Sequence, residues 1–210
     1  MKNGIKYLVA GLVATGISVG AYANITVNGG TALNTFMADK DLNYLDGNLI
    51  EIGTFTVAPT IGSPSLANFV VYGSTLTQSG VSAGVFSFSK TASDTGFLHT
   101  QIYVVAFNNA TGVGATQEGI YFVNDSNASN WKFPATADFP NSTSFDMQDM
   151  FTSGNAVTPS AGSTVVFGST QRDTVNGDNA VKLALVPEPS TWMLVGTGLL
   201  GLLGLRRRRS

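Results

Sequence analysis

The sequence lacks cysteine, contains a single histidine, and has only 11% charged residues in a chain of 210. Without cysteine it has no disulfide framework, no thiolate metal site and no cysteine nucleophile. A typical soluble domain is roughly 25% charged, so this chain has less than half the usual charge. Because 43% of its residues are hydrophobic, the low charge does not indicate disorder, which requires few apolar residues.

Basic side chains are also scarce between the two ends of the chain. From Asn24 to Val186 there are five Lys or Arg and twelve Asp or Glu, which leaves a formal charge of −7. A nucleic-acid-binding surface needs clustered basic residues. Nucleic acid is therefore not expected as a partner.

The first 23 residues have the three parts of a secretory signal peptide. Lys2 and Lys6 precede an apolar run over residues 7–19, and Ala21-Tyr22-Ala23 forms a small-residue cleavage site. As a helix this run is only about 20 Å long, which is short for a membrane span. We therefore expect the export machinery to translocate the chain and signal peptidase to cut after Ala23. An uncleaved membrane anchor is the alternative.

Residues 186–210 form a second segregated pattern, in which Pro187-Glu188-Pro189 precedes an uncharged stretch over residues 192–205. Four arginines close the chain: Arg206, Arg207, Arg208 and Arg209. Such a cluster favours the cytoplasmic side of a membrane, which agrees with an exported domain before it. As a helix the uncharged stretch is about 21 Å long, against a hydrocarbon core of roughly 30 Å. This marginal length predicts a transient membrane anchor.

The Pro-Glu-Pro motif, the short Gly/Leu-rich stretch and the arginine cluster together resemble the PEP-CTERM sorting signal of Gram-negative bacteria. The resemblance implies processing near Pro187-Glu188-Pro189 by an exosortase, a transpeptidase-like membrane enzyme. It also implies an association with extracellular polysaccharide and biofilm. It implies no particular activity, because the same tail occurs on secreted enzymes and on ice-binding proteins. An ordinary short anchor with a chance Pro-Glu-Pro is the alternative.

The segment between the two ends, residues 24–185, is expected to be one all-β domain. It shows no helical period, and short β-branched and aromatic runs recur between Gly, Asn, Asp, Ser and Pro. Phe86 and Phe88 alternate with Ser87 and Ser89, the pattern of a strand with one buried face. Predicted strands cover residues 33–37, 49–57, 69–76, 85–89, 102–107, 119–123, 164–169 and 180–185. Many short strands without helices predict an antiparallel β-sandwich or jelly roll.

Two connections in this domain have recognisable signals. Residues 124–159 are rich in Asn, Ser, Thr and Pro, which predicts a long loop with one or two weak strands. Asn176-Gly177 predicts a two-residue hairpin turn.

A second resemblance lies within the domain. Residues 101–108, residues 115–121 and Trp131 are similar to a passenger domain that recurs on PEP-CTERM proteins. This resemblance implies one folded unit and no assigned activity.

A nucleophile motif is present but lacks its expected context. Gly80-Val81-Ser82-Ala83-Gly84 matches the G-x-S-x-G elbow, and Asp94 and His99 follow in hydrolase order. The elbow requires a strand before it and a helix after it, whereas residues 85–89 are predicted as another strand. We therefore expect no catalytic site. A secreted hydrolase, either a glycosidase or an esterase, is the rival hypothesis.

Candidate calcium ligands lie in two acidic turns. Asp39, Asp41 and Asp46 are close in sequence, and residues 173–178 include two further aspartates. Carboxylate oxygens suit calcium, but Tyr44 stands where an EF-hand loop needs glycine. Solvated turn carboxylates are the simpler interpretation. We therefore expect no metal and no other cofactor, with calcium as the alternative.

Trp131 is the aromatic residue that we expect to be exposed, because Asn130 and Lys132 flank it in a polar stretch. An exposed indole could stack on a sugar ring, whereas packing inside the core is the alternative. The sequence as a whole predicts an exported, non-catalytic protein of the cell surface or extracellular matrix that binds polysaccharide. Ice binding would need a regular threonine array, which is not visible.

Overall fold

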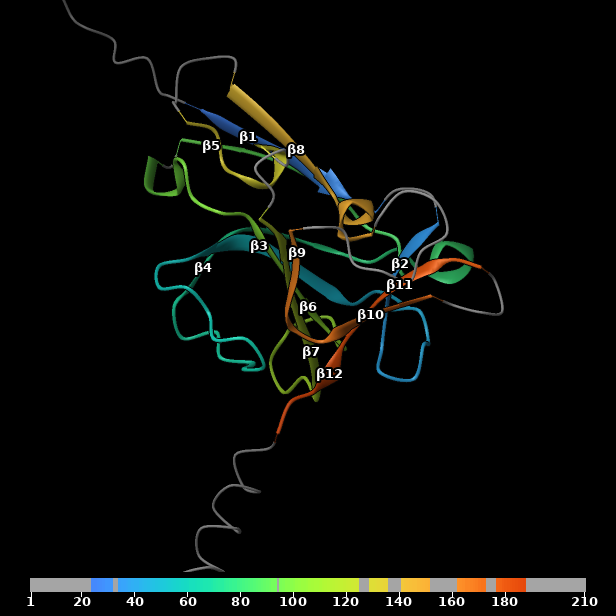
Figure 1. The fold of residues 1–210 in the computed structure, drawn as a ribbon. Helices are drawn as coiled ribbons and strands as arrows, with labels where there is room; N and C mark the ends of the chain where they lie inside the picture. Colours follow the sequence, from blue (N-terminus) through green and yellow to red (C-terminus); the bar gives the residue numbers. More distant parts are fainter. Residues whose placement is uncertain are drawn as a thin grey trace, which may run out of the picture.

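The computed structural model describes residues 24–31, 34–93, 95–124, 129–135, 141–151, 162–172 and 177–187. These residues form twelve β-strands and four 3₁₀ helices, so the fold is all-β, as predicted. The strands group into three sheets (Figure 1). The short helices are η1 (Gly80–Ser82), η2 (Thr95–Phe97), η3 (Ser129–Trp131) and η4 (Met147–Met150).

The largest sheet is antiparallel and forms the centre of the domain. Its strand order is β12-β7-β6-β3-β4, and β9 pairs with the part of β7 that β12 leaves open. Its strands are β3 (Leu49–Phe55), β4 (Phe69–Leu76), β6 (Tyr103–Phe107), β7 (Gln117–Val123), β9 (Ser163–Phe167) and β12 (Ala184–Leu185).

Two three-stranded sheets complete the domain, and each contains a parallel pair. One has the order β5-β1-β8, with β1 (Ile25–Gly30) parallel to β8 (Asn141–Asp146) and antiparallel to β5 (Ser87–Ala92). The other has the order β10-β11-β2 and consists of β2 (Thr35–Ala38), β10 (Ser169–Arg172) and β11 (Asn179–Lys182). Strand β11 runs parallel to β2. The prediction of an antiparallel β-sandwich or jelly roll is therefore confirmed in its all-β class, while these two smaller sheets depart from a fully antiparallel arrangement.

Both faces of the central sheet are covered at β6, in which every residue is buried. On one face Val104 and Ala106 join the main core, which also includes Ile25 and Val27 of β1 and Phe86. On the other face lies a second cluster around Tyr103, Val105, Phe107, Ile120 and Val166. A strand that is buried on both faces needs a continuous apolar run, which Tyr-Val-Val-Ala-Phe provides.

Most predicted strands are confirmed, with shifted ends. Strand β4 covers the predicted residues 69–76, while the segment predicted as 85–89 begins at Ser87 as β5. Phe86 and Phe88 are buried, as the alternation predicted. Strand β8 lies inside the polar stretch 124–159, for which a long loop with one or two weak strands is predicted. Strand β1 is not among the predicted strands, because its residues Asn28-Gly29-Gly30 resemble a turn.

The hairpin between β10 and β11 is confirmed, but its connection is longer than the predicted two-residue turn. Its last paired residues are Arg172 and Asn179.

Among the described residues, no helix is long and apolar enough to cross a membrane. The predicted signal segment 1–23 and most of the predicted sorting segment, 188–210, lie outside the described residues.

Candidate functional site

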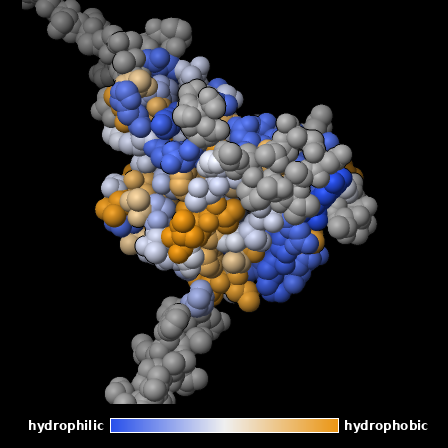
Figure 2. Space-filling model, viewed as in Figure 1, coloured by the Kyte–Doolittle hydropathy of each residue, from blue (hydrophilic) through white to orange (hydrophobic). Residues whose placement is uncertain are grey.

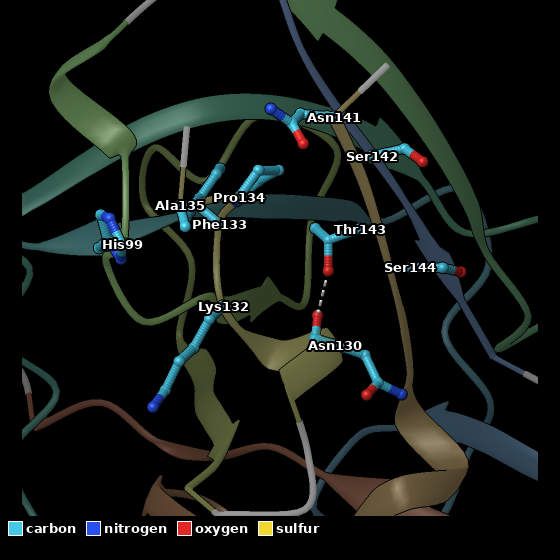
Figure 3. A pocket seen from close by; sticks show the side chains of 10 residues that line it. All are labelled: His99, Asn130, Lys132, Phe133, Pro134, Ala135, Asn141, Ser142, Thr143 and Ser144. Atoms are coloured by element: carbon cyan, nitrogen blue, oxygen red, sulfur yellow. Dashed lines mark hydrogen bonds between the residues drawn. The ribbon is translucent and has the colours of Figure 1, made fainter. Parts of the chain in front are cut away.

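An open groove of about 570 Å³ lies beside strand β8 (Figure 3). Its described lining comes from β8, from the turn before β6, and from η3 with the segment that follows it. The lining residues are His99, Asn130, Lys132, Phe133, Pro134, Ala135, Asn141, Ser142, Thr143 and Ser144.

The base of the groove is the segment around Trp131, which pairs with the chain before β6. The Ile102 amide donates to the Trp131 carbonyl at 2.8 Å, and the Phe133 amide donates to the Thr100 carbonyl at 2.9 Å. The Gln101 side-chain amide donates to the same Trp131 carbonyl at 2.7 Å. These bonds fix the backbone on either side of Lys132.

The wall of the groove is β8, whose side chains alternate in exposure. Ser142 and Ser144 are exposed, while Thr143 is half-buried. The Thr143 hydroxyl donates to the Asn130 carbonyl at 2.9 Å, which ties the wall to the base (Figure 3). The alternating Ser/Thr pattern of residues 142–144 was the only sequence signal for this wall, and we had predicted the surrounding stretch as mainly loop.

Trp131 does not form the predicted exposed platform. It is fully buried, its ring centroid lies 5.1 Å from that of Phe145, and its Nε1–H donates to Asp149 at 3.0 Å. The flanking Asn130 and Lys132 are exposed instead. In this turn the polar neighbours face solvent and the indole faces the core, where Asp149 satisfies its only polar atom. The prediction that Trp131 forms a ligand surface is therefore wrong.

His99 lies on the opposite side of the groove from β8, as Lys132 does (Figure 3). Its φ of 62° is in the left-handed region, which non-glycine residues rarely adopt. Its amide donates to the Pro134 carbonyl at 3.2 Å, which helps to hold this conformation. The His99 side chain is exposed, as expected for a surface histidine.

The residues of the nucleophile motif do not form the elbow of a hydrolase. Ser82 ends the 3₁₀ helix η1, and the chain continues in an extended conformation at Ala83. Asp94 lies outside the described residues. His99 lines the groove, whereas Ser82 is not among its described lining residues.

One pair of carboxyl groups in the described structure is electrostatically coupled. Burial, and to a smaller extent the charge of Glu51, together raise the pKa of Glu118 to about 7. Burial also raises the pKa of Glu51. Both belong to the central sheet, and neither is among the described residues that line the groove.

The candidate calcium ligands around Asp39 have other partners. Asp39 accepts hydrogen bonds from the amides of Asp41 at 2.8 Å and Asn43 at 2.9 Å, and from the Asn43 side chain at 2.9 Å. Burial opposes them, but together these bonds lower the pKa of Asp39. Asp41 pairs with Lys40 at 2.5 Å. Within the described ranges no three His, Asp or Glu side chains form a group that could hold a metal.

The sorting residues follow the last strand directly. Leu185 pairs with Gln117, the Val186 amide donates to the Thr116 carbonyl at 2.9 Å, and Pro187 is exposed. Figure 2 shows apolar atoms gathered on the domain close to where the C-terminal segment leaves it. The other predicted sorting residues lie outside the described part of the chain: Ala21, Ala23, Glu188, Pro189, Arg206, Arg207, Arg208 and Arg209.

Comparison with known protein families matches residues 185–209 to the PEP-CTERM protein-sorting motif. Comparisons with curated proteins and with solved structures find no match. The match covers only the C-terminal segment, so it carries no information on the activity of the β domain. The similarity of residues 101–131 to a passenger domain stays a prediction. The motif indicates export, a C-terminal sorting and anchor region, and an exosortase as the processing partner. The chain therefore contains a PEP-CTERM protein-sorting motif, which begins at the last strand of an all-β domain and indicates an exported protein targeted to an exosortase.

Proposed function

We propose that this chain is a non-catalytic protein of the cell surface or extracellular matrix of a Gram-negative bacterium. After processing by exosortase, its β domain binds polysaccharide in the groove beside β8. The observation that carries the proposal is a groove that combines amide and hydroxyl side chains with the apolar Phe133, Pro134 and Ala135, on a domain that is followed by a sorting motif.

The chemistry of the groove suits sugar hydroxyls. Its described lining includes Asn130, Asn141 and Thr143, whose side chains carry amide and hydroxyl groups. Amides and hydroxyls both donate and accept hydrogen bonds, as sugar hydroxyls do. Figure 1 shows β1 and β8 at the end of the domain remote from β12. A ligand would therefore reach the groove while the C-terminal segment is still held at the membrane.

The rival function, a secreted glycosidase, needs two carboxyl groups about 5 to 9 Å apart in a cleft. Among the described residues that line the groove, none is acidic. The coupled pair Glu51 and Glu118 lies in the central sheet, where Glu118 is only 6% exposed. These observations favour binding over hydrolysis.

A glycan array with the full chain, produced in an exporting host, tests the binding function. Asn130→Ala removes an exposed amide from the groove, and one hydrogen bond is worth about 1 kcal/mol. We expect affinity to fall about fivefold. Asn68→Ala removes an exposed amide outside the described groove lining and is the matched control. No binding to any glycan, or equal effects of the two variants, would contradict the proposal.

The sorting function has its own test. Replacing Pro187-Glu188-Pro189 with alanines should leave the unprocessed chain in the membrane fraction of a host that carries an exosortase. Unchanged release of the variant would show that processing does not depend on this motif.

A further inference from the structure

We propose that the groove beside β8 binds an acidic sugar, a glycan that carries carboxylate or sulfate groups. This inference rests on the proposed function, because it names the class of polysaccharide that the groove takes. It is carried by the charge of the groove lining and by the way in which the fold presents Lys132.

The groove differs in charge from the domain that contains it. The region from Asn24 to Val186 has a formal charge of −7, yet the described groove lining holds Lys132 and His99 and no acidic residue. A second groove, of about 440 Å³, shares Ser144 with the first. Its described lining holds Asp146 and no basic residue. A polyanion is therefore repelled less at the first groove than at the second, because the second carries a like charge.

The backbone around Lys132 forces its ammonium group into solvent. Trp131 and Phe133 are 0% and 2% exposed, so both neighbours face the core. Lys132 forms a bridge with Gln101, and in an extended segment successive side chains point to opposite sides. The Lys132 side chain must therefore point outward, and it is exposed. Among the described residues it forms no ion pair.

The neutral polar groups of the groove supply the remainder of a sugar site. Asn141 and residues 142–144 line the β8 side, while Lys132 and His99 lie across the groove (Figure 3). A sugar ring between them would meet the Asn141 amide and the Thr143 hydroxyl on one side and a cation on the other. Ser142 and Ser144 point to the opposite face of β8. A hydrogen bond to a charged group is stronger than one between neutral groups, so the ammonium group favours an acidic sugar over its neutral form.

The experiment compares two ligands that differ only in charge. Isothermal titration of the full chain uses tetragalacturonate and its fully methyl-esterified form, at low and high salt. We expect the acid to bind about tenfold more tightly than the ester, with a difference that shrinks at high salt. Lys132→Gln should remove this preference, while Lys132→Arg should keep it. Lys40→Gln removes an exposed ammonium outside the described groove lining and should change neither affinity.

The outcomes separate this inference from the proposed function. Equal binding of acid and ester would overturn the charge preference and leave polysaccharide binding intact. Binding of neither ligand would overturn the acidic-sugar inference, and a glycan array that is also negative would contradict the proposed function. Equal binding of poly-L-glutamate would show a general attraction for polyanions and would overturn a sugar site.

Discussion

Single residues of this domain illustrate how burial changes chemistry. Glu118 is 6% exposed, and its Oε1 has no hydrogen-bond partner among the described residues. In the sheet it lies opposite Phe107 on one side and Ala184 on the other. A buried carboxylate without a partner is costly, so the protonated form is favoured and the pKa rises to about 7.

This raised pKa predicts a stability that depends on pH. In the folded chain Glu118 binds its proton more tightly than in the unfolded chain, where its pKa is about 4.5. The stabilisation is therefore complete below pH 4.5 and is lost as the pH rises to about 7. We expect the free energy of unfolding to fall by about 3 kcal/mol over this range. Urea titrations of the wild type and Glu118→Gln at several pH values measure it. An unchanged slope in Glu118→Gln would assign the dependence to other groups.

Trp131 stabilises the groove rather than contacting a ligand. We predict that Trp131→Ala lowers the free energy of unfolding by about 4 kcal/mol, because it leaves a large cavity. Trp131→Phe should lose less, since it keeps most of the apolar contact with Phe145 and gives up the bond to Asp149. Thermal denaturation measures both changes. Loss of glycan binding by Trp131→Ala at full thermal stability would instead show direct ligand contact.

At the scale of elements, the parallel pair β1 and β8 holds the groove wall in place. Gly29 lies opposite Phe145 in this pair, and the Phe145 ring occupies the space of a side chain at position 29. A Cβ there would lie 2.2 Å from the ring. The glycine is therefore required by packing, although its φ is not positive.

Gly29→Ala is accordingly expected to displace Phe145 and loosen β8. Overpacking of this kind costs about 2 kcal/mol, and affinity in the groove should fall because the wall moves. Adding Phe145→Leu should restore part of the stability, since the smaller side chain makes room. Thermal denaturation and amide exchange of β8 check both. If Gly29→Ala is as stable as the wild type, the close packing of β1 against Phe145 is not required.

At the scale of the whole molecule, the sorting motif begins where the fold ends. The match starts at Leu185, which is paired in β12, and the Val186 amide is bonded to Thr116. No linker separates Pro187 from this edge. Because cleavage prefers exposed and flexible chain, we expect the paired edge that ends at Val186 to slow processing of the motif that follows it.

An insertion of Gly-Ser-Gly between Val186 and Pro187 is therefore expected to speed processing. The inserted residues move the motif away from β12 and leave the sequences of the motif and of β12 unchanged. Pulse-chase labelling in a host with an exosortase measures the rate at which the precursor disappears. The control is the same insertion in the loop at Gly62. A Cβ added at that position would lie within 4 Å of no other atom. Equal rates for the wild type and the junction variant would show that β12 does not limit processing.

Local pattern and composition were enough to predict the sorting signal and most strands. The Pro-Glu-Pro motif with its arginine cluster is read by other proteins as a linear signal, so the residues alone carry it. Phe86 and Phe88 face the core because side chains of a strand alternate between two faces. These predictions do not depend on which distant segments of the chain contact one another in the fold.

Tertiary structure decided the features that depend on distant contacts. The pairing of β1 with β8 joins residues 25–30 to residues 141–146, and no local pattern specifies a parallel partner so far along the chain. Trp131 is buried because its ring packs against Phe145 and its Nε1–H donates a hydrogen bond to Asp149, although its neighbours in sequence are polar. The groove exists only because β8 lies beside the segment that contains Lys132. Burial and site geometry arise from long-range packing, whereas signals and strands arise from local sequence.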